Sequence, residues 1–207
     1  MTGPSAAPRF QIEPVSLDGE HVRLLPLSQD HAADLRDAAR DGEGWRLWYT
    51  SVPTPEGMTA EIERRLELRN KHGMLPFTVV RPSDNRIVGM TSFMNIDRAV
   101  PRVEIGSTWY AASVRRTALN TEAKWLLLSH AFETWSVVAV EFRTHFLNHA
   151  SRRAIERLGA KLDGVLRAHQ RMLDGSLRDS CVYSIVAAEW PAVRTHLRWQ
   201  LDAPRER

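Results

Sequence analysis

The scarcest informative residue in this 207-residue sequence is cysteine, because Cys181 is the only one. A lone cysteine excludes an intramolecular disulfide framework and fits a reducing compartment. No neighbouring residue in the sequence indicates an activated thiolate, so we expect a buried thiol at this position. The pair His145 and His149 straddles a predicted strand-to-helix junction without a convincing third ligand. We therefore expect no bound metal.

Long apolar runs are also missing. No stretch approaches the roughly 20 apolar residues that a membrane-spanning helix needs. The first residues, MTGPSAAPRFQIEP, have no basic start followed by an apolar block, and so they do not resemble a signal peptide. We expect a soluble, cytoplasmic protein with a flexible leader over residues 1–16, a single domain over residues 17–201 and a short tail over residues 202–207.

The chain lacks a strong excess of one charge. It has 28 lysines and arginines against 25 aspartates and glutamates, so its net charge is only +3 although its pI is about 9.4. No long basic run marks a nucleic-acid footprint, and we do not expect nucleic-acid binding. The pI alone leaves an RNA- or ribosome-binding protein as an alternative. The arginine pairs Arg115/Arg116 and Arg152/Arg153 lie near predicted helix starts, where they suit a small anion such as a phosphorylated cofactor.

The residues that are present alternate between strand and helix patterns. Apolar runs bounded by turn signals predict strands at residues 21–27, 75–82, 87–96, 102–110, 137–146, 161–173 and 177–187. Helical patterns cover residues 28–42, 59–73, 121–135, 148–160 and 189–201. This order predicts a mixed α/β sheet. In RVEIGSTWY, simple alternation places Val103, Ile105, Ser107 and Trp109 on one face, with Glu104 on the other.

The stretch VRRTALNTEAKWLLL, residues 114–128, places arginines, hydroxyls and small side chains at the start of a buried helix. The first N–H groups of a helix lack internal partners and carry the positive end of its dipole, which is a geometry that binds phosphate. One interpretation is a pyrophosphate cradle. The alternative is an ordinary helix start, with Asn120 or Thr121 as the N-cap and with solvated arginines.

Three motifs occur in one order: VEIGSTWY at residues 103–110, RRTALN at 115–120 and NHASRRAIERLGA at 148–160. In this order the sequence resembles the GNAT superfamily of acetyl-CoA-dependent N-acetyltransferases, and most closely its ribosomal-protein alanine acetyltransferases. The resemblance covers residues 17–186. It implies the GNAT fold, which has a mixed, mostly antiparallel twisted sheet with a splay between two central strands and helices on both faces.

The same resemblance implies acetyl-CoA as cosubstrate, no metal, and direct acetyl transfer to a primary amine of a protein N-terminus or a small molecule. Many relatives pair as homodimers. The alternative is a GNAT-fold sensor or assembly module that binds CoA without catalysis. The pyrophosphate loop lacks glycine, and its small positions fall on Ala118 and Asn120. Ile155 stands where many relatives have a tyrosine that protonates the leaving thiolate.

Candidate residues follow from the resemblance together with the residue chemistry. Glu104 is the candidate base, acting directly or through water, unless it is an ion-paired strand residue. Ser151 is the candidate acid, unless it only helps to start a helix. Tyr183 is an alternative acid, although its pattern favours core packing. Trp45, Trp48 and Tyr49 shape the acceptor site or pack beneath a loop. The expected acetyl-CoA contacts are Trp109, Tyr110, Arg115, Arg116, Thr117, Ala118, Leu119, Asn120, Thr121, Asn148 and Ser151.

Overall fold

The computed structural model describes residues 12–71, 73–172 and 174–203. Residues 1–11 of the expected leader and residues 204–207 of the expected tail lie outside them. The strands are β1 (Leu17–Asp18), β2 (Arg23–Pro26), β3 (Met74–Arg81), β4 (Arg86–Asp97), β5 (Arg102–Tyr110), β6 (Ala139–His145), β7 (Lys161–Arg171) and β8 (Leu177–Val186). The α-helices are α1 (Ala32–Arg40), α2 (Met58–Asn70), α3 (Ala118–Ser129), α4 (His149–Glu156) and α5 (Trp190–Asp202). In the described part of the chain, none of the helices has the length and apolar character needed to cross a membrane.

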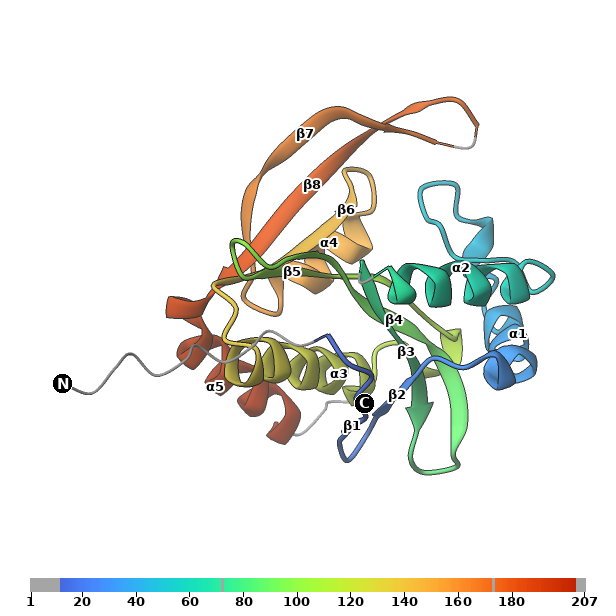
Figure 1. Ribbon diagram of the computed structural model, residues 1–207, viewed down its shortest axis with the longest axis horizontal. Coiled ribbons are helices and arrows are strands. Elements are labelled where there is room, and N and C mark those ends of the chain that lie inside the picture. The colour runs from blue at the N-terminus through green and yellow to red at the C-terminus, as the bar shows by residue number, and fades with distance from the viewer. Residues whose placement is uncertain (1–11, 72, 173, 204–207) are drawn as a thin grey trace.

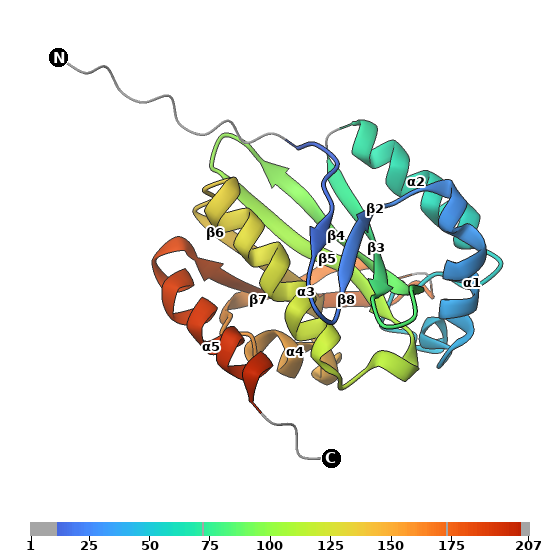
Figure 2. The same cartoon turned by 90° about the horizontal axis from the view of Figure 1, so that it is seen from below.

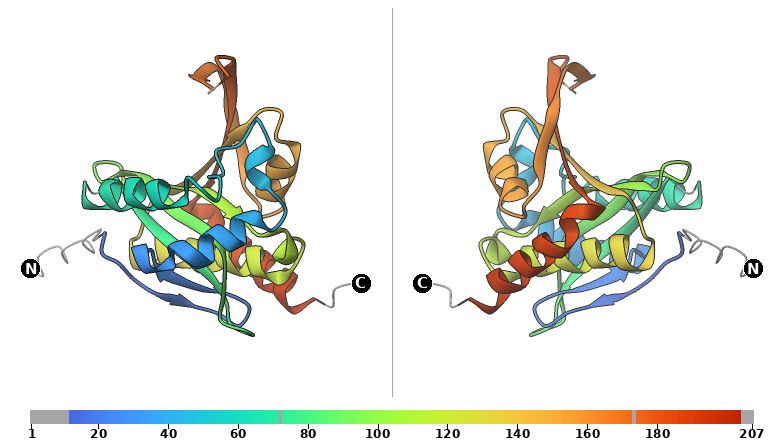
Figure 3. Two further views of the ribbon diagram at one scale, coloured as in Figure 1. Left: turned by 90° about the vertical axis from the view of Figure 1, so that its right-hand side faces the viewer. Right: turned by 90° about the vertical axis from the view of Figure 1, so that its left-hand side faces the viewer.

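The strands form one 8-stranded sheet in the order β1-β2-β3-β4-β5-β6-β8-β7 (Figure 1). Every neighbouring pair is antiparallel except β5 and β6, which run parallel. This arrangement confirms the predicted mixed α/β sheet. The β7–β8 hairpin rises away from the helices that pack on the rest of the sheet (Figure 3).

Helices cover both faces of the sheet, as the predicted fold requires. Two adjacent residues of β4 accept hydrogen bonds from helices on opposite faces. Lys124 of α3 donates to Thr91, and Arg65 of α2 donates to Ser92. Figure 2 shows α3 and α5 side by side on one face of the sheet, with α1 and α2 beyond the other. The apolar side chains of the central strands, among them Phe77 and Phe93, fill the space between these layers and form the core.

The alternation predicted for β5 is wrong beyond Ile105. Met90 of β4 pairs with Trp109 and Ser92 pairs with Gly106, so three residues of β5 span the distance that two residues of β4 span. The extra residue is a β-bulge, and Ser107 has a left-handed φ of 49° there. A bulge reverses the order of faces, so Trp109 lies on the side of Glu104 and Thr108 lies on the side of α3.

The start of α3 also differs from the prediction. Thr117 is the N-cap, and its hydroxyl accepts the N–H of Leu119. Asn120 and Thr121, which were the predicted caps, instead lie in the first helical turn because the chain leaves its extended conformation at Thr117. At its other end the helix continues into one π-helical turn, His130–Thr134, and so reaches the expected length.

Candidate acetyl-transfer site

The separation of β5 from β6 creates a cavity in the described structure. The two strands pair only at Arg102–Glu104 with Ala139–Glu141, although both continue well beyond these residues. The diverging ends, the start of α4 and residues 49–52 enclose a cavity of about 690 Å³. The splay that the resemblance implied is therefore present.

One wall of the cavity is cationic. Arg115, Arg116 and Arg153 all line it, together with Asn120 at the start of α3. The Arg115 side chain folds back so that its Nε and Nη2 donate to the carbonyl of Tyr110 at 3.2 and 3.1 Å. This contact holds one guanidinium beside the end of β5. An anion entering here meets three arginines and the positive end of a helix dipole.

The structure divides the residues expected to contact acetyl-CoA into two groups. Those that line the cavity are Trp109, Tyr110, Arg115, Arg116, Asn120, Asn148 and Ser151. Thr117, Ala118 and Leu119 border a separate hollow of about 180 Å³. Thr121 is buried and accepts a hydrogen bond from Arg157. These residues differ because successive helical side chains point about 100° apart. Asn120 and Lys124, four residues apart, therefore face the cavity together.

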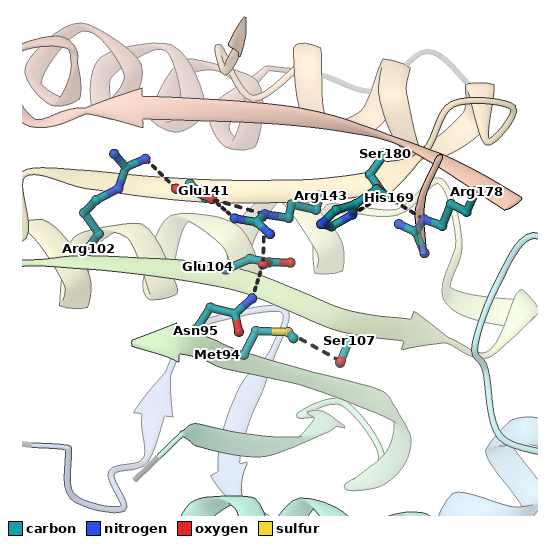
Figure 4. Close-up of polar contacts among 10 residues, drawn as sticks. All are labelled: Met94, Asn95, Arg102, Glu104, Ser107, Glu141, Arg143, His169, Arg178 and Ser180. Atoms are coloured by element: carbon teal, nitrogen blue, oxygen red, sulfur yellow. Dashed lines mark hydrogen bonds and ion pairs between the residues drawn. The ribbon is translucent and has the colours of Figure 1, made fainter. Parts of the chain in front are cut away.

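Glu104 lies at the point where β5 and β6 part. The residue is 5% exposed, and its carboxylate accepts a hydrogen bond from Asn95 at 2.7 Å and lies 3.5 Å from the guanidinium of Arg143 (Figure 4). It is not among the lining residues, but a Cβ placed on the lining residue Gly106 would lie 2.9 Å from its Oε1. Burial raises the pKa of Glu104, and the hydrogen bond from Asn95 opposes that shift.

Asn148 and Ser151 form the cap of α4 at the edge of the cavity. The Asn148 side chain accepts the N–H of Ser151 at 3.0 Å, so Asn148 is the N-cap of α4. Both residues also line the cavity, as does Ile155, for which the family resemblance implied a tyrosine in many relatives. The Ser151 hydroxyl thus remains a candidate proton donor at this edge.

Tyr183 and Cys181 are core residues. Tyr183 is fully buried, and its hydroxyl donates to Glu156 at 2.8 Å and accepts from Arg152 at 3.1 Å. These bonds occupy the hydroxyl on the α4 side of the sheet, which favours the packing role over the acid role. Cys181 is also fully buried, and burial raises the pKa of its thiol. The expected buried thiol is therefore confirmed.

The three aromatic residues before α2 do not act as one cluster. Tyr49 lines the cavity, and Trp48 makes edge contacts with Tyr49 and with the lining residue His145, with ring centroids 5.6 and 5.1 Å apart. Trp48 keeps 54% of its surface exposed, so it stands at the rim. Trp45 lies away from the lining, under the guanidinium of Arg46 at 4.9 Å.

Sequence reasoning missed two buried cations that line the cavity. Lys124 is 6% exposed, and its Nζ donates to Thr108 at 2.9 Å and to Thr91 at 3.3 Å. Burial lowers its pKa to about 7. Arg65 is 1% exposed, pairs with Glu61 at 2.7 Å, and donates to the Ser107 carbonyl at the bulge. A lysine inside the apolar run AKWLLL was the available signal for the first of these.

The cavity also carries polar groups that the sequence did not assign to this site. Arg143, His145 and Arg178 all line it. His145 is 5% exposed, its Nδ1 accepts the N–H of Leu147, and burial lowers its pKa. Over the described residues, no group of three or more His, Cys, Asp or Glu side chains is arranged to hold a metal ion.

Comparison with known proteins assigns the family. Residues 21–161 match the model of the acetyltransferase (GNAT) domain, so the chain belongs to the GNAT family and is an N-acetyltransferase. No curated protein matches the sequence significantly. A GCN5-related N-acetyltransferase from Brucella melitensis is 31% identical, with a TM-score of 0.82 over 93% of this chain and 87% of that one.

Two structures from the ribosomal-protein branch share the fold. RimJ from Mycobacterium smegmatis, solved with CoA-disulfide, has a TM-score of 0.77 at 20% identity and covers 90% of this chain and 95% of that one. Ribosomal-protein-S5-alanine acetyltransferase from Vibrio fischeri has a TM-score of 0.69 at 18% identity, with 85% and 98% covered. At these identities, the likeness concerns the fold.

Proposed function

We propose that this protein transfers an acetyl group from acetyl-CoA directly to a primary amine in a ternary complex. The observation that carries the proposal is the cavity at the β5–β6 splay, which has an arginine-rich wall at one end and Glu104 beside the other. RimJ, which shares the fold, was solved with CoA-disulfide, and this supports a CoA site here. The cationic wall suits the phosphates of CoA, and the splayed strand offers unpaired backbone groups to its arm.

Each chemical requirement of acetyl transfer has a candidate group. Glu104 takes the proton of the incoming ammonium, directly or through water, and its raised pKa suits a base near neutral pH. Backbone N–H groups near Trp109 and Tyr110 polarise the thioester carbonyl. Ser151 supplies a proton to the departing thiolate, in a chain where Ile155 replaces the usual tyrosine.

The cationic wall gives a direct test of cofactor binding. Replacing Arg115 and Arg116 together by Ala should weaken acetyl-CoA binding by about 10- to 100-fold, because charge-assisted contacts to phosphate are lost. The loss should shrink at high salt. Isothermal titration calorimetry measures it, with Arg198→Ala on exposed α5 as the matched control. An unchanged dissociation constant in the double variant would refute the phosphate cradle.

The rim aromatic gives a test of acceptor binding. Trp48→Ala should raise KM for the acceptor amine several-fold while acetyl-CoA affinity stays within twofold, because Trp48 packs on His145 at the rim and lies away from the arginine wall. Steady-state kinetics with both substrates varied measures the two effects. Leu47→Ala, which alters another exposed residue of the same loop, is the control. A larger change in acetyl-CoA affinity than in KM for the amine would contradict the assignment of Trp48 to the acceptor site.

A non-catalytic CoA-binding module is the second candidate, supported by the glycine-free loop and by Ile155. An amine panel incubated with acetyl-CoA and followed by mass spectrometry separates the two functions. Acetylated product from any amine establishes the enzyme, whereas tight CoA binding without turnover across the panel establishes the module. We also propose a cytoplasmic location, supported by the lone buried thiol, and a homodimer. Sedimentation velocity tests the homodimer.

A further inference from the structure

Several polar side chains near the splay share one face of the sheet. In β6, Arg143 pairs across from Val182, and His145 pairs across from Ser180. Side chains two positions apart share a face, so Arg178 lies on the same side as Ser180 and Arg143. The hydrogen bond from Arg178 Nε to Ser180 Oγ, at 3.0 Å, agrees with this placement (Figure 4). Glu104 also belongs to this face, since it lies 3.5 Å from Arg143.

The charges on this face are compensated except at one arginine. Arg143 pairs with Glu141 at 3.0 Å and with Glu104, and Arg65 pairs with Glu61. Arg178 forms no ion pair with any carboxylate among the described residues. Its side chain is partly buried and lines the cavity, while only its Nε has a bonded partner there, the Ser180 hydroxyl.

A partly buried guanidinium without a directly paired carboxylate is unfavourable, and a ligand that brings a carboxylate lowers that cost. Burial lowers the pKa of Arg178, and the Glu104 carboxylate, which is already paired with Arg143, only partly opposes that shift. The two terminal nitrogens of a guanidinium match the two oxygens of a carboxylate. The unpaired positive charge of Arg178 therefore lies on the same face of the sheet as the candidate base, Glu104.

We propose that the acceptor amine carries a carboxylate and that Arg178 binds it, while the amine lies toward Glu104. This inference rests on the proposed acetyl transfer and narrows its substrate to amino acids or to peptides with an acidic residue beside the N-terminus. The two sources share one chemistry, an amine and a carboxylate in the same molecule. Arg178 then acts as a specificity-determining residue, because an amine without a carboxylate leaves its charge unpaired.

The experiment compares matched acceptor amines that differ in whether they carry a carboxylate. Glycine, β-alanine and γ-aminobutyrate are assayed against their amides and decarboxylated amines, and alanyl-aspartate amide is assayed against alanyl-asparagine amide. For the wild-type protein, we expect kcat/KM for at least one carboxylate-bearing amine to be at least 10-fold higher than for the corresponding amide. Preference within the amino-acid series identifies a free amino acid, and preference within the peptide pair identifies an acidic N-terminal segment.

The variant Arg178→Gln should reduce that preference to within twofold, through a larger loss of kcat/KM for the acids than for the amides. Arg167→Gln, an exposed arginine on the same hairpin, should keep the wild-type preference. Acetylation of acids and amides at equal rates would overturn this inference and leave acetyl transfer standing. Acetyl-CoA binding without product from any member of the panel would overturn the proposed function, and this inference with it.

Discussion

Glu104→Gln is expected to lower kcat at pH 7 by about 100-fold while acetyl-CoA affinity changes less than twofold. General-base catalysis contributes roughly 10²- to 10⁴-fold, and the amide keeps the shape of the side chain while losing the basic oxygen. The wild-type rate should fall as pH drops through the raised pKa of Glu104, because the protonated carboxyl cannot accept a proton. The pH–rate profile of the variant should lack this fall at low pH, and its rate should recover partly at high pH, where the free amine becomes abundant.

Two measurements separate this result from a folding defect. A group whose folded pKa is raised stabilises the fold below its unfolded pKa and loses that stabilisation as pH rises through the folded value. At neutral pH the buried Glu104 carboxylate therefore costs stability, and the Gln variant should not melt lower than wild type by more than a few degrees. Glu63→Gln, on the exposed side of α2, is the matched control for charge. Superimposable pH–rate profiles for wild type and Glu104→Gln would make Glu104 a structural residue.

The elements with strong local signals were predictable from the sequence. The predicted order of strands and helices is confirmed, except that the two-residue β1 was not predicted. Glycines also mark local changes of chain direction, at Gly175 between β7 and β8 and at Gly159 after α4, where φ is 85° and 98°. In each case the deciding information is local, such as an apolar period or a glycine where the chain needs a positive φ. The splay between β5 and β6 was predicted from the family resemblance and not from a local sequence pattern.

Two features could not be predicted because they depend on contacts across the sheet. Ser107 adopts a left-handed conformation that serine rarely prefers, and the Ser107 carbonyl there accepts a bond from the buried Arg65. No local pattern in RVEIGSTWY indicates the bulge, so the simple alternation predicted the wrong face for Trp109. The place of Arg178 in the site depends in the same way on the pairing of β8 with β6 and on the parting of β5 from β6.

Lys124→Met is expected to raise the free energy of unfolding at pH 7 by about 2 kcal/mol. Lys124 is 6% exposed, and burial lowers its pKa from 10.5 to about 7. At ~1.4 kcal/mol per pKa unit, that difference corresponds to a cost of at most ~5 kcal/mol at low pH. The hydrogen bonds to Thr108 and Thr91 return part of it, roughly 1–3 kcal/mol, and methionine has nearly the same length.

The pH dependence of Lys124→Met identifies the cause. Between about pH 7 and pH 10.5 the unfolded chain binds a proton at Lys124 that the folded chain has released, so the stability of wild type rises with pH across this window. The advantage of methionine should therefore be largest at pH 7 and below, and should shrink toward zero or reverse by pH 10. Urea unfolding at pH 7 and pH 10 measures both values. Lys71→Met, at an exposed lysine, should change stability by less than about 0.5 kcal/mol at either pH, since surface ion pairs contribute little. An equal gain for Lys124→Met at both pH values would show that packing, and not the buried charge, limits the stability of this fold.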